Sequence, residues 1–177
     1  MLYGNQQLSG KERFFDEDEL IVSKTDLTGK LVYGNRTFYK LAGLSEKECI
    51  GQQHNIIRHP EMPRCVFHYL WTTLKKGEEV FAYINNRSAN GDNYWVFAHV
   101  TPSFDNNGQS IGYHSNRRVP NRKVIEKHII PLYKDLLALE KSISSPKEAL
   151  DASYNKLLSV VANQKVGFNE WMFSLTA

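Results

Sequence analysis

The chain has 177 residues, of which 41% are hydrophobic and 23% charged, and its formal net charge is +3. This length and composition predict a globular protein with one main domain, and they exclude a disordered chain, a fibre and a disulfide scaffold. The two cysteines, Cys49 and Cys65, form no CxxC pair and no metal-type spacing with histidine, which is typical of a reducing cytosol. Aromatic residues reach 12%, which fits either a core or a ligand pocket.

The sequence contains no segment that predicts membrane insertion or export. No apolar stretch approaches the roughly 20 residues of a transmembrane helix, and the N-terminus lacks a basic-then-apolar signal pattern. We therefore expect a cytoplasmic protein. Residues 117–127 carry five basic residues against one acidic residue. We interpret this cluster as a solvated helix start or an electrostatic docking patch, because no basic stripe with interleaved aromatics indicates nucleic-acid binding.

The first part of the chain predicts two strands followed by short helices. A turn sequence separates two apolar runs, and helical spacing, a capping box and a proline at a helix start mark the segments that follow. The elements expected here are strands at 19–23 and 30–33, helices at 36–42 and from Ser45, and a longer helix that starts at Pro63 and ends before Gly77.

Residues 79–118 predict three antiparallel strands. The segments 79–87, 93–101 and 110–117 are rich in β-forming residues, and Asn- and Gly-containing turns separate them. Two strands, several helices and three more strands predict an α+β fold, with a five-stranded antiparallel sheet and short helices on one face.

The sequence after Pro120 is helical. Asn121 starts a helix that we expect Pro131 to interrupt, and Ser145 starts a second helix. A last segment at 168–175 contains several aromatic residues. Because these segments are too short for a free coiled coil, they predict a helical hairpin that docks partly on the sheet domain.

The order of elements in about a hundred residues resembles a PAS domain. Coverage is about residues 20–118, and the string HN-x-x-RHP-x-MP at 54–63 is the most specific part of the match. The tail, at 131–134 and 146–150, more loosely resembles the standalone PAS proteins of bipartite energy-taxis systems. The stretches that resemble the flavin-binding PAS domain of bacterial aerotaxis receptors are 35–38, 51–63, 70–78, 86–87 and 90–96.

This resemblance implies a division of the chain and a function. We expect an N-terminal cap segment at 1–18, a PAS sensor domain at 19–118 and a C-terminal helical extension at 119–177. The resemblance implies a bound FAD whose redox state is signalled to a membrane chemoreceptor with a cytoplasmic HAMP segment. Such a receptor can recruit the protein to the inner membrane, and a homodimer is a further expectation.

The resemblance also implies roles for individual residues. Arg58 and His59 match the motif that the family needs for FAD, and Arg58 is suited to hold a phosphate or carboxylate. Asn85 corresponds to an amide that faces the ring edge, and Trp71 packs from the helix. The full set of candidate cofactor-binding residues is Asn35, His54, Arg58, His59, Glu61, Trp71, Asn85, Val96, Ala98 and His114, where Val96 and Ala98 form the pocket wall and Glu61 replaces the more usual Asp.

Several of these residues also have a purely structural interpretation. Trp71 fits a core position on an apolar helix stripe, Asn85 fits a strand end, and His59 fits a tight turn. By resemblance, His54 stands at the position where light-sensing flavin PAS domains carry an adduct-forming cysteine. A thiol adduct therefore cannot form at this position.

Two other functions remain open at the level of sequence. If strand alternation puts Val96 and Ala98 inward, His99 points outward, whereas His114 is expected in the cleft, where it could bind haem as one axial ligand. A ligand-free PAS interaction module is the second alternative. We expect no enzyme, because the sequence has no catalytic triad order, phosphate loop or nicotinamide-binding glycine motif.

Overall fold

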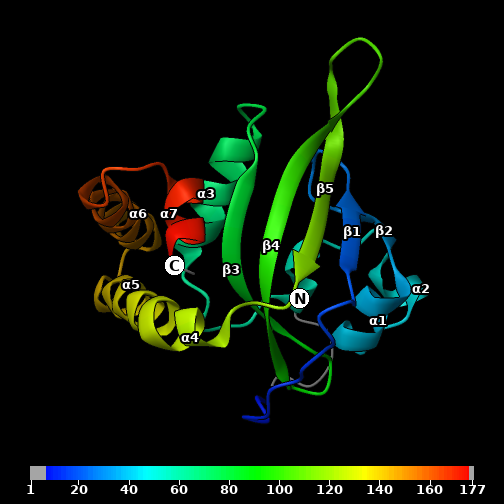
Figure 1. The fold of residues 1–177 in the computed structure, drawn as a ribbon, viewed down its shortest axis with the longest axis horizontal. Helices are drawn as coiled ribbons and strands as arrows, with labels where there is room; N and C mark the ends of the chain where they lie inside the picture. Colours follow the sequence, from blue (N-terminus) through cyan, green and yellow to red (C-terminus); the bar gives the residue numbers. More distant parts are fainter. Residues whose placement is uncertain (1–6, 176–177) are drawn as a thin grey trace.

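The computed structural model describes residues 7–175 and contains a five-stranded antiparallel sheet with the order β2-β1-β5-β4-β3 (Figure 1). The last strand, β5, pairs with β1, so the two halves of the sheet come from opposite ends of the domain sequence. The predicted α+β class is confirmed. The strands are β1 (Ile21–Thr25), β2 (Leu31–Gly34), β3 (Val80–Arg87), β4 (Asn93–Phe104) and β5 (Ser110–Arg118).

Short helices connect β2 to β3, and the predicted caps start and stop them. The Asn35 side chain accepts a hydrogen bond from the Phe38 N–H at 2.9 Å, and Gly43 ends the first helix with φ at 66°. Ser45 and Glu48 form the predicted capping box. These helices are α1 (Arg36–Ala42), α2 (Glu46–Cys49), the 3-10 helix η1 (His54–Ile57) and α3 (Arg64–Leu74).

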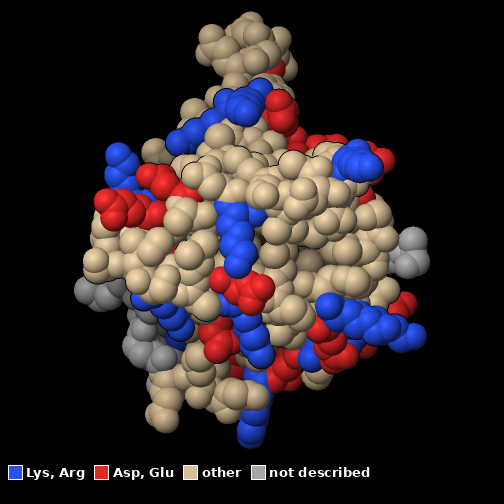
Figure 2. Space-filling view, turned by 90° about the vertical axis from the view of Figure 1, so that its left-hand side faces the viewer, with Lys and Arg blue, Asp and Glu red and all other residues tan. Residues whose placement is uncertain are grey.

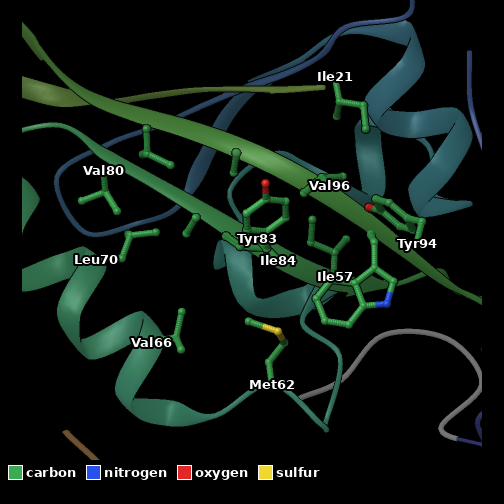
Figure 3. Packing of buried hydrophobic residues seen from close by; sticks show 14 of the residues in the cluster. Ile21, Ile57, Met62, Val66, Leu70, Val80, Tyr83, Ile84, Tyr94 and Val96 are labelled. Carbon is green, nitrogen blue, oxygen red and sulfur yellow. The ribbon is translucent and has the colours of Figure 1, made fainter. Parts of the chain in front are cut away.

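The main core lies between α3 and the sheet. Figure 3 shows Val66 and Leu70 of α3 on one side of this core and Val80 and Ile84 of β3 on the other. All four side chains are at most 7% exposed. Burial of these apolar side chains holds α3 against the sheet.

The helix after β5 is continuous, so the expectation that Pro131 interrupts it is wrong. It consists of α4 (Arg122–Val124), the π-helical η2 (Ile125–Ile129) and α5 (Ile130–Ser142). In a regular α-helix, the ring of Pro131 would clash with the carbonyl of Lys127. The wider π turn, closed by a hydrogen bond from the Ile130 N–H to the Ile125 carbonyl, precedes the proline and lets the helix pass through it.

The predicted helical hairpin is formed by α5 and α6 (Pro146–Asn163), and it lies along the β3 edge and α3 (Figure 1). Near its start, α5 contacts the sheet face opposite α3, where the Tyr133 hydroxyl donates to the Tyr83 carbonyl at 2.7 Å. Near its end, the Glu140 side chain reaches the N-terminus of α3. The helix α5 therefore passes around the edge of the sheet.

The last helix, α7 (Phe168–Ser174), covers the β3 edge. The Asn169 side chain accepts from the Phe81 N–H at 2.9 Å and donates to the Glu79 carbonyl at 3.0 Å. Its amide thus replaces a neighbouring strand at this position. Phe173 packs on Phe81 with ring centroids 4.6 Å apart.

The segment before β1 runs along the β3–β4 turn. The Ser9 N–H donates to the Gly91 carbonyl at 3.0 Å, and Arg13 pairs with Asp92 at 3.0 Å. Residues 1–6 of the expected cap segment lie outside the described residues. Within the described part of the chain, no helix has both the length and the apolar character needed to cross a bilayer.

Candidate functional site: a cavity between α3 and the sheet

A cavity of about 590 Å³ opens between η1, α3 and the inner face of the sheet. Its size is in the range of small-molecule sites, and its wall combines apolar and aromatic surface with several polar side chains. The residues that matter most for its chemistry are Ser23 and Thr25 on β1, His54 on η1, Arg58 before α3, Trp71 on α3, Asn86 on β3, and Tyr113, Ser115 and Arg117 on β5.

Arg117 is a buried cation in the cavity wall. Its side chain is held by β5, where strand alternation puts Tyr113, Ser115 and Arg117 on the same face. The residue is 3% exposed, and desolvation lowers the pKa of Arg117 to about 10. Among residues 7–175, no carboxylate forms an ion pair with it. Such a charge is costly to bury alone, so this wall of the cavity favours an anionic or electron-rich ligand.

His54 is oriented by Arg117. The Arg117 Nη2 lies 2.7 Å from the His54 Nε2 and 2.7 Å from the Ser23 hydroxyl oxygen. Because a guanidinium only donates, the His54 Nε2 accepts, and the proton of the neutral ring lies on Nδ1. Desolvation and the nearby Arg117 charge lower the pKa of His54 to about 3. The pair therefore presents one positive charge at neutral pH.

Several unpartnered polar atoms belong to residues that line the cavity. Among the described residues, the buried side-chain atoms that lack a hydrogen-bond partner include Thr25 Oγ1, Asn86 Nδ2, Ser115 Oγ and Arg117 Nη1. All four residues line the cavity. Buried polar atoms in native proteins normally have partners, and a ligand in the cavity is one source of the partners that these four atoms lack.

Aromatic rings form another part of the wall. The Trp71 and Tyr113 rings meet edge to face with centroids 5.3 Å apart. Gly29 lies against them with φ at 81°, and a Cβ there would lie 3.6 Å from the Trp71 ring. The wall therefore offers flat apolar surface beside the polar groups of β5, which suits a planar heteroaromatic ligand.

Arg58 lies in the part of the wall formed by the chain before α3. Its guanidinium lies over the Phe67 ring at 4.6 Å, and its Nη2 donates to the Met62 carbonyl at 2.9 Å. Desolvation lowers the pKa of Arg58, and the Glu140 carboxylate opposes this shift. Arg58 is thus a second fixed cation at the cavity.

Three residues of the predicted candidate set line the cavity, namely His54, Arg58 and Trp71. Two more face the same side of the sheet but lie deeper in the core: Val96 and Ala98 are each 0% exposed and do not reach the cavity surface. The resemblance implied that both side chains form the pocket wall; they point inward but do not line the cavity.

Asn85 and His114 face the opposite side of the sheet, so the expectation that they face the cleft is wrong. Asn85 accepts a hydrogen bond from the Asn93 side chain at 3.1 Å, and the neighbouring Asn86 takes the place in the cavity. Along β5, Tyr113 and Ser115 face the cavity, and the intervening His114 therefore faces away. A shift of one residue in a strand moves a side chain to the other face.

The remaining candidates lie outside the cavity. Asn35 caps α1 and also accepts from the Val22 N–H at 3.1 Å. His59 is 5% exposed, and its Nδ1 accepts from the Glu61 N–H at 3.3 Å, which fixes the turn before α3. The Glu61 side chain is exposed.

Sequence reasoning missed Arg117, Asn86, Ser115 and Tyr113. Arg117 was assigned to a solvated basic cluster, which is wrong for this residue because it is buried. The alternation of side chains along β5 could have predicted three of them. Once Tyr113 is placed on the inner face of the sheet, Ser115 and Arg117, two and four positions later, lie on the same face.

The fold and the cavity define a PAS domain. A profile of the PAS fold family matches residues 31–117, and this part of the chain belongs to that family. The aerotaxis receptor of Escherichia coli strain K12 is 40% identical over 122 residues, which cover 69% of this chain and 24% of that receptor. The chain thus spans about a quarter of the length of this relative.

Solved structures support the fold assignment. A PAS domain from Colwellia psychrerythraea has a TM-score of 0.53 at 21% identity and covers 57% of this chain and 86% of its own. A light-oxygen-voltage domain studied with a flavin analogue has a TM-score of 0.55 at 16% identity and covers 66% of this chain and 87% of its own. At these identities the likeness is one of fold.

Proposed function

We propose that the protein is a non-catalytic sensor that binds a flavin in the cavity and responds to its redox state. The observation that carries this proposal is Arg117, a buried cation without a carboxylate partner among the described residues. Similarity to an aerotaxis receptor supports a redox or energy signal, and a light-oxygen-voltage domain of the same fold has been studied with a flavin analogue.

The side chains of the cavity suit a flavin. Trp71 and Tyr113 offer flat apolar surface for a ring system, and Asn86 and Ser115 offer polar atoms for a heteroatom edge. Arg58 is available for a phosphate. When bound, a flavin supplies reversible electron transfer coupled to protonation.

The chain's own contribution to sensing is electrostatic. Arg117 holds a fixed positive charge in the wall, and His54 stays neutral beside it. This arrangement favours the ligand state with more negative charge near β5. The hydrogen bond from Arg117 to Ser23 ties that response to β1 and therefore to the sheet.

We assign FAD rather than FMN on the resemblance to aerotaxis receptors. The proposed partner is a membrane chemoreceptor with a cytoplasmic HAMP segment, and the proposed location is the cytoplasm, with recruitment to the inner membrane by that receptor. Figure 2 views the side of the molecule where α5 and α6 lie, on which acidic and basic side chains are interspersed with uncharged areas. Such a mixed surface suits a protein partner better than a nucleic acid.

Haem is the weaker second candidate. His114, the residue expected to bind it, faces away from the cavity, and the His54 Nε2 is engaged by Arg117. The two cysteines are buried and do not line the cavity, so no thiol is available there for an adduct.

The test is the absorption spectrum of the purified protein. A visible flavin spectrum that bleaches with dithionite supports the proposal, and chromatography of the released cofactor separates FAD from FMN. A Soret band supports haem instead. A colourless protein that also fails to take up added FAD or FMN overturns the flavin proposal and leaves the ligand-free interaction module.

A further inference from the structure

The carboxylate of Glu140 occupies a buried position between three elements. It belongs to the last turn of α5, is 8% exposed, and lies at the N-terminus of α3. Its Oε2 accepts from the Arg64 N–H at 3.0 Å. Its Oε1 accepts from the Cys65 N–H at 3.0 Å and from the Ser153 hydroxyl of α6 at 2.9 Å.

This contact supplies a cap that α3 does not have in its own sequence. Pro63 stands at the N-cap position and offers no side-chain acceptor. The first N–H groups of a helix have no partner within the helix, and its N-terminus favours a negative charge. Glu140, 75 residues beyond Cys65, satisfies both needs. The start of α3 therefore depends on the docking of the hairpin.

The same helix forms a wall of the cavity. Trp71, Leu70 and Phe67 of α3 line it, and Arg58, which lies over Phe67, precedes it. The hairpin reaches the cavity too, because Leu150 of α6 also lines it. A displacement of α3 by the ligand would therefore change its contacts with both α5 and α6.

The chemistry of the contact makes it respond as a unit. Among residues 7–175, no Lys, Arg or His forms an ion pair with Glu140, although the Arg58 charge is near enough to interact with it. The hydrogen-bond donors to its carboxylate include the first N–H groups of α3 and the Ser153 hydroxyl. A buried charge that loses its donors is strongly destabilised. The contact is thus either intact or broken, as a two-state element requires.

We propose that Glu140 is the positioning residue through which the cavity and the C-terminal hairpin act on one another. The redox part of this inference rests on the proposed flavin function, whereas the structural coupling does not. Coupling between two sites is reciprocal, so the factor by which the ligand state changes hairpin docking equals the factor by which docking changes the relative affinity for the two ligand states. The hairpin is then the element that carries the signal to a partner.

The first experiment requires no ligand. Amide hydrogen exchange is measured on the full chain for the wild type, Glu140→Gln and the control Asp135→Asn, an exposed carboxylate on the same helix. In Glu140→Gln we expect exchange to rise roughly tenfold or more in both α3 and the hairpin. Asp135→Asn should match the wild type. Unchanged exchange in α3 of Glu140→Gln overturns the coupling.

The second experiment compares the oxidised and the dithionite-reduced flavoprotein. In the wild type, hairpin exchange should differ between the two states, and in Glu140→Gln this difference should disappear while the flavin midpoint potential shifts. A purely structural role would leave the potential unchanged. The inference is overturned if the flavin midpoint potential is the same in the two proteins, or if amide exchange of the wild-type hairpin is the same in the oxidised and reduced states.

The two proposals fail in different ways. Wild-type protein that binds no flavin overturns the proposed function, and the ligand-free exchange experiment still decides the role of Glu140. Should Glu140→Gln not fold, Ser153→Ala removes one donor to the carboxylate and keeps the cap of α3. We expect this variant to change hairpin exchange in the same direction, and no change there counts against the coupling.

Discussion

Arg117 both lowers the stability of the empty protein and favours ligand binding at the cavity. A buried guanidinium without an ion-pair partner costs folding free energy, and this cost falls when an anionic or electron-rich ligand meets it. Removal of the charge should therefore have opposite effects on the empty and the ligand-bound protein.

We predict that Arg117→Met weakens flavin binding at least about tenfold, because a charge-assisted hydrogen bond contributes about 1.5–3 kcal/mol. The same change should raise or leave unchanged the stability of the apoprotein, measured by urea unfolding. Arg118→Met, an exposed neighbour on the same strand, is the matched control. Unaltered flavin affinity in Arg117→Met would remove this residue from the site.

The two adjacent asparagines of β3 give a direct test of which sheet face binds the ligand. Asn86 lines the cavity with an unpartnered Nδ2, whereas Asn85 bonds to Asn93 on the other face. We predict that Asn86→Ala releases flavin or shifts its absorption spectrum and that Asn85→Ala does neither. The reverse pattern in titrations of the two apoproteins with FAD would contradict the orientation of β3.

His54 makes the apoprotein sensitive to acid. Its folded pKa of about 3 lies below the ordinary value of 6.5, so the unfolded chain takes up a proton first as the pH falls. The stability that neutral His54 contributes is therefore complete above pH 6.5 and is lost progressively toward pH 3, by up to about 1.4 kcal/mol per pH unit. Urea unfolding at several pH values should show a shallower acid loss for His54→Gln than for the wild type. Parallel curves would contradict the assigned state of His54.

At the scale of elements, sequence patterns located the strands and helices better than they located the faces of β3. Capping residues such as Asn35 and Ser45 act locally, so their helices start where the sequence predicts. β3 is buried on both faces and therefore shows no alternation that would separate Asn85 from Asn86. The second face is covered by α5 and α7, whose docking no local pattern reports.

The α7 helix should owe part of its position to one side chain. Asn169 makes two hydrogen bonds at the outer edge of the sheet, one with Phe81 of β3 and one with Glu79 just before it. We predict that Asn169→Ala lowers the free energy of unfolding by about 1 kcal/mol, because water replaces part of what is lost. Chemical denaturation measures this, with Glu170→Ala on the same helix as the control. An equal effect of the two substitutions would show that the edge contact is unimportant.

At the scale of the whole molecule, the sheet domain and the C-terminal helices share one buried cluster. Trp71 lies on α3, Trp95 on β4 and Trp171 on α7, so tryptophan fluorescence reports on all three regions. We predict one cooperative unfolding transition in urea, with coincident fluorescence and far-ultraviolet circular dichroism curves. Two separated transitions would mean that the helical extension unfolds independently.

The π-helical turn before Pro131 has a consequence for how this chain tolerates changes in length. A π turn holds one residue more than an α turn, so a deletion within 126–128 would return this turn to regular α-helix and bring the ring of Pro131 against the carbonyl four residues before it. A deletion or insertion of one residue in the regular part of α5 before Glu140 would instead rotate everything downstream by about 100° and shift it by about 1.5 Å. Glu140 would point away from α3, and the hairpin would present a different stripe to the domain. The number of residues between the sheet and the hairpin therefore sets how the hairpin docks. An insertion or deletion of one residue there should disturb this docking more than most substitutions do.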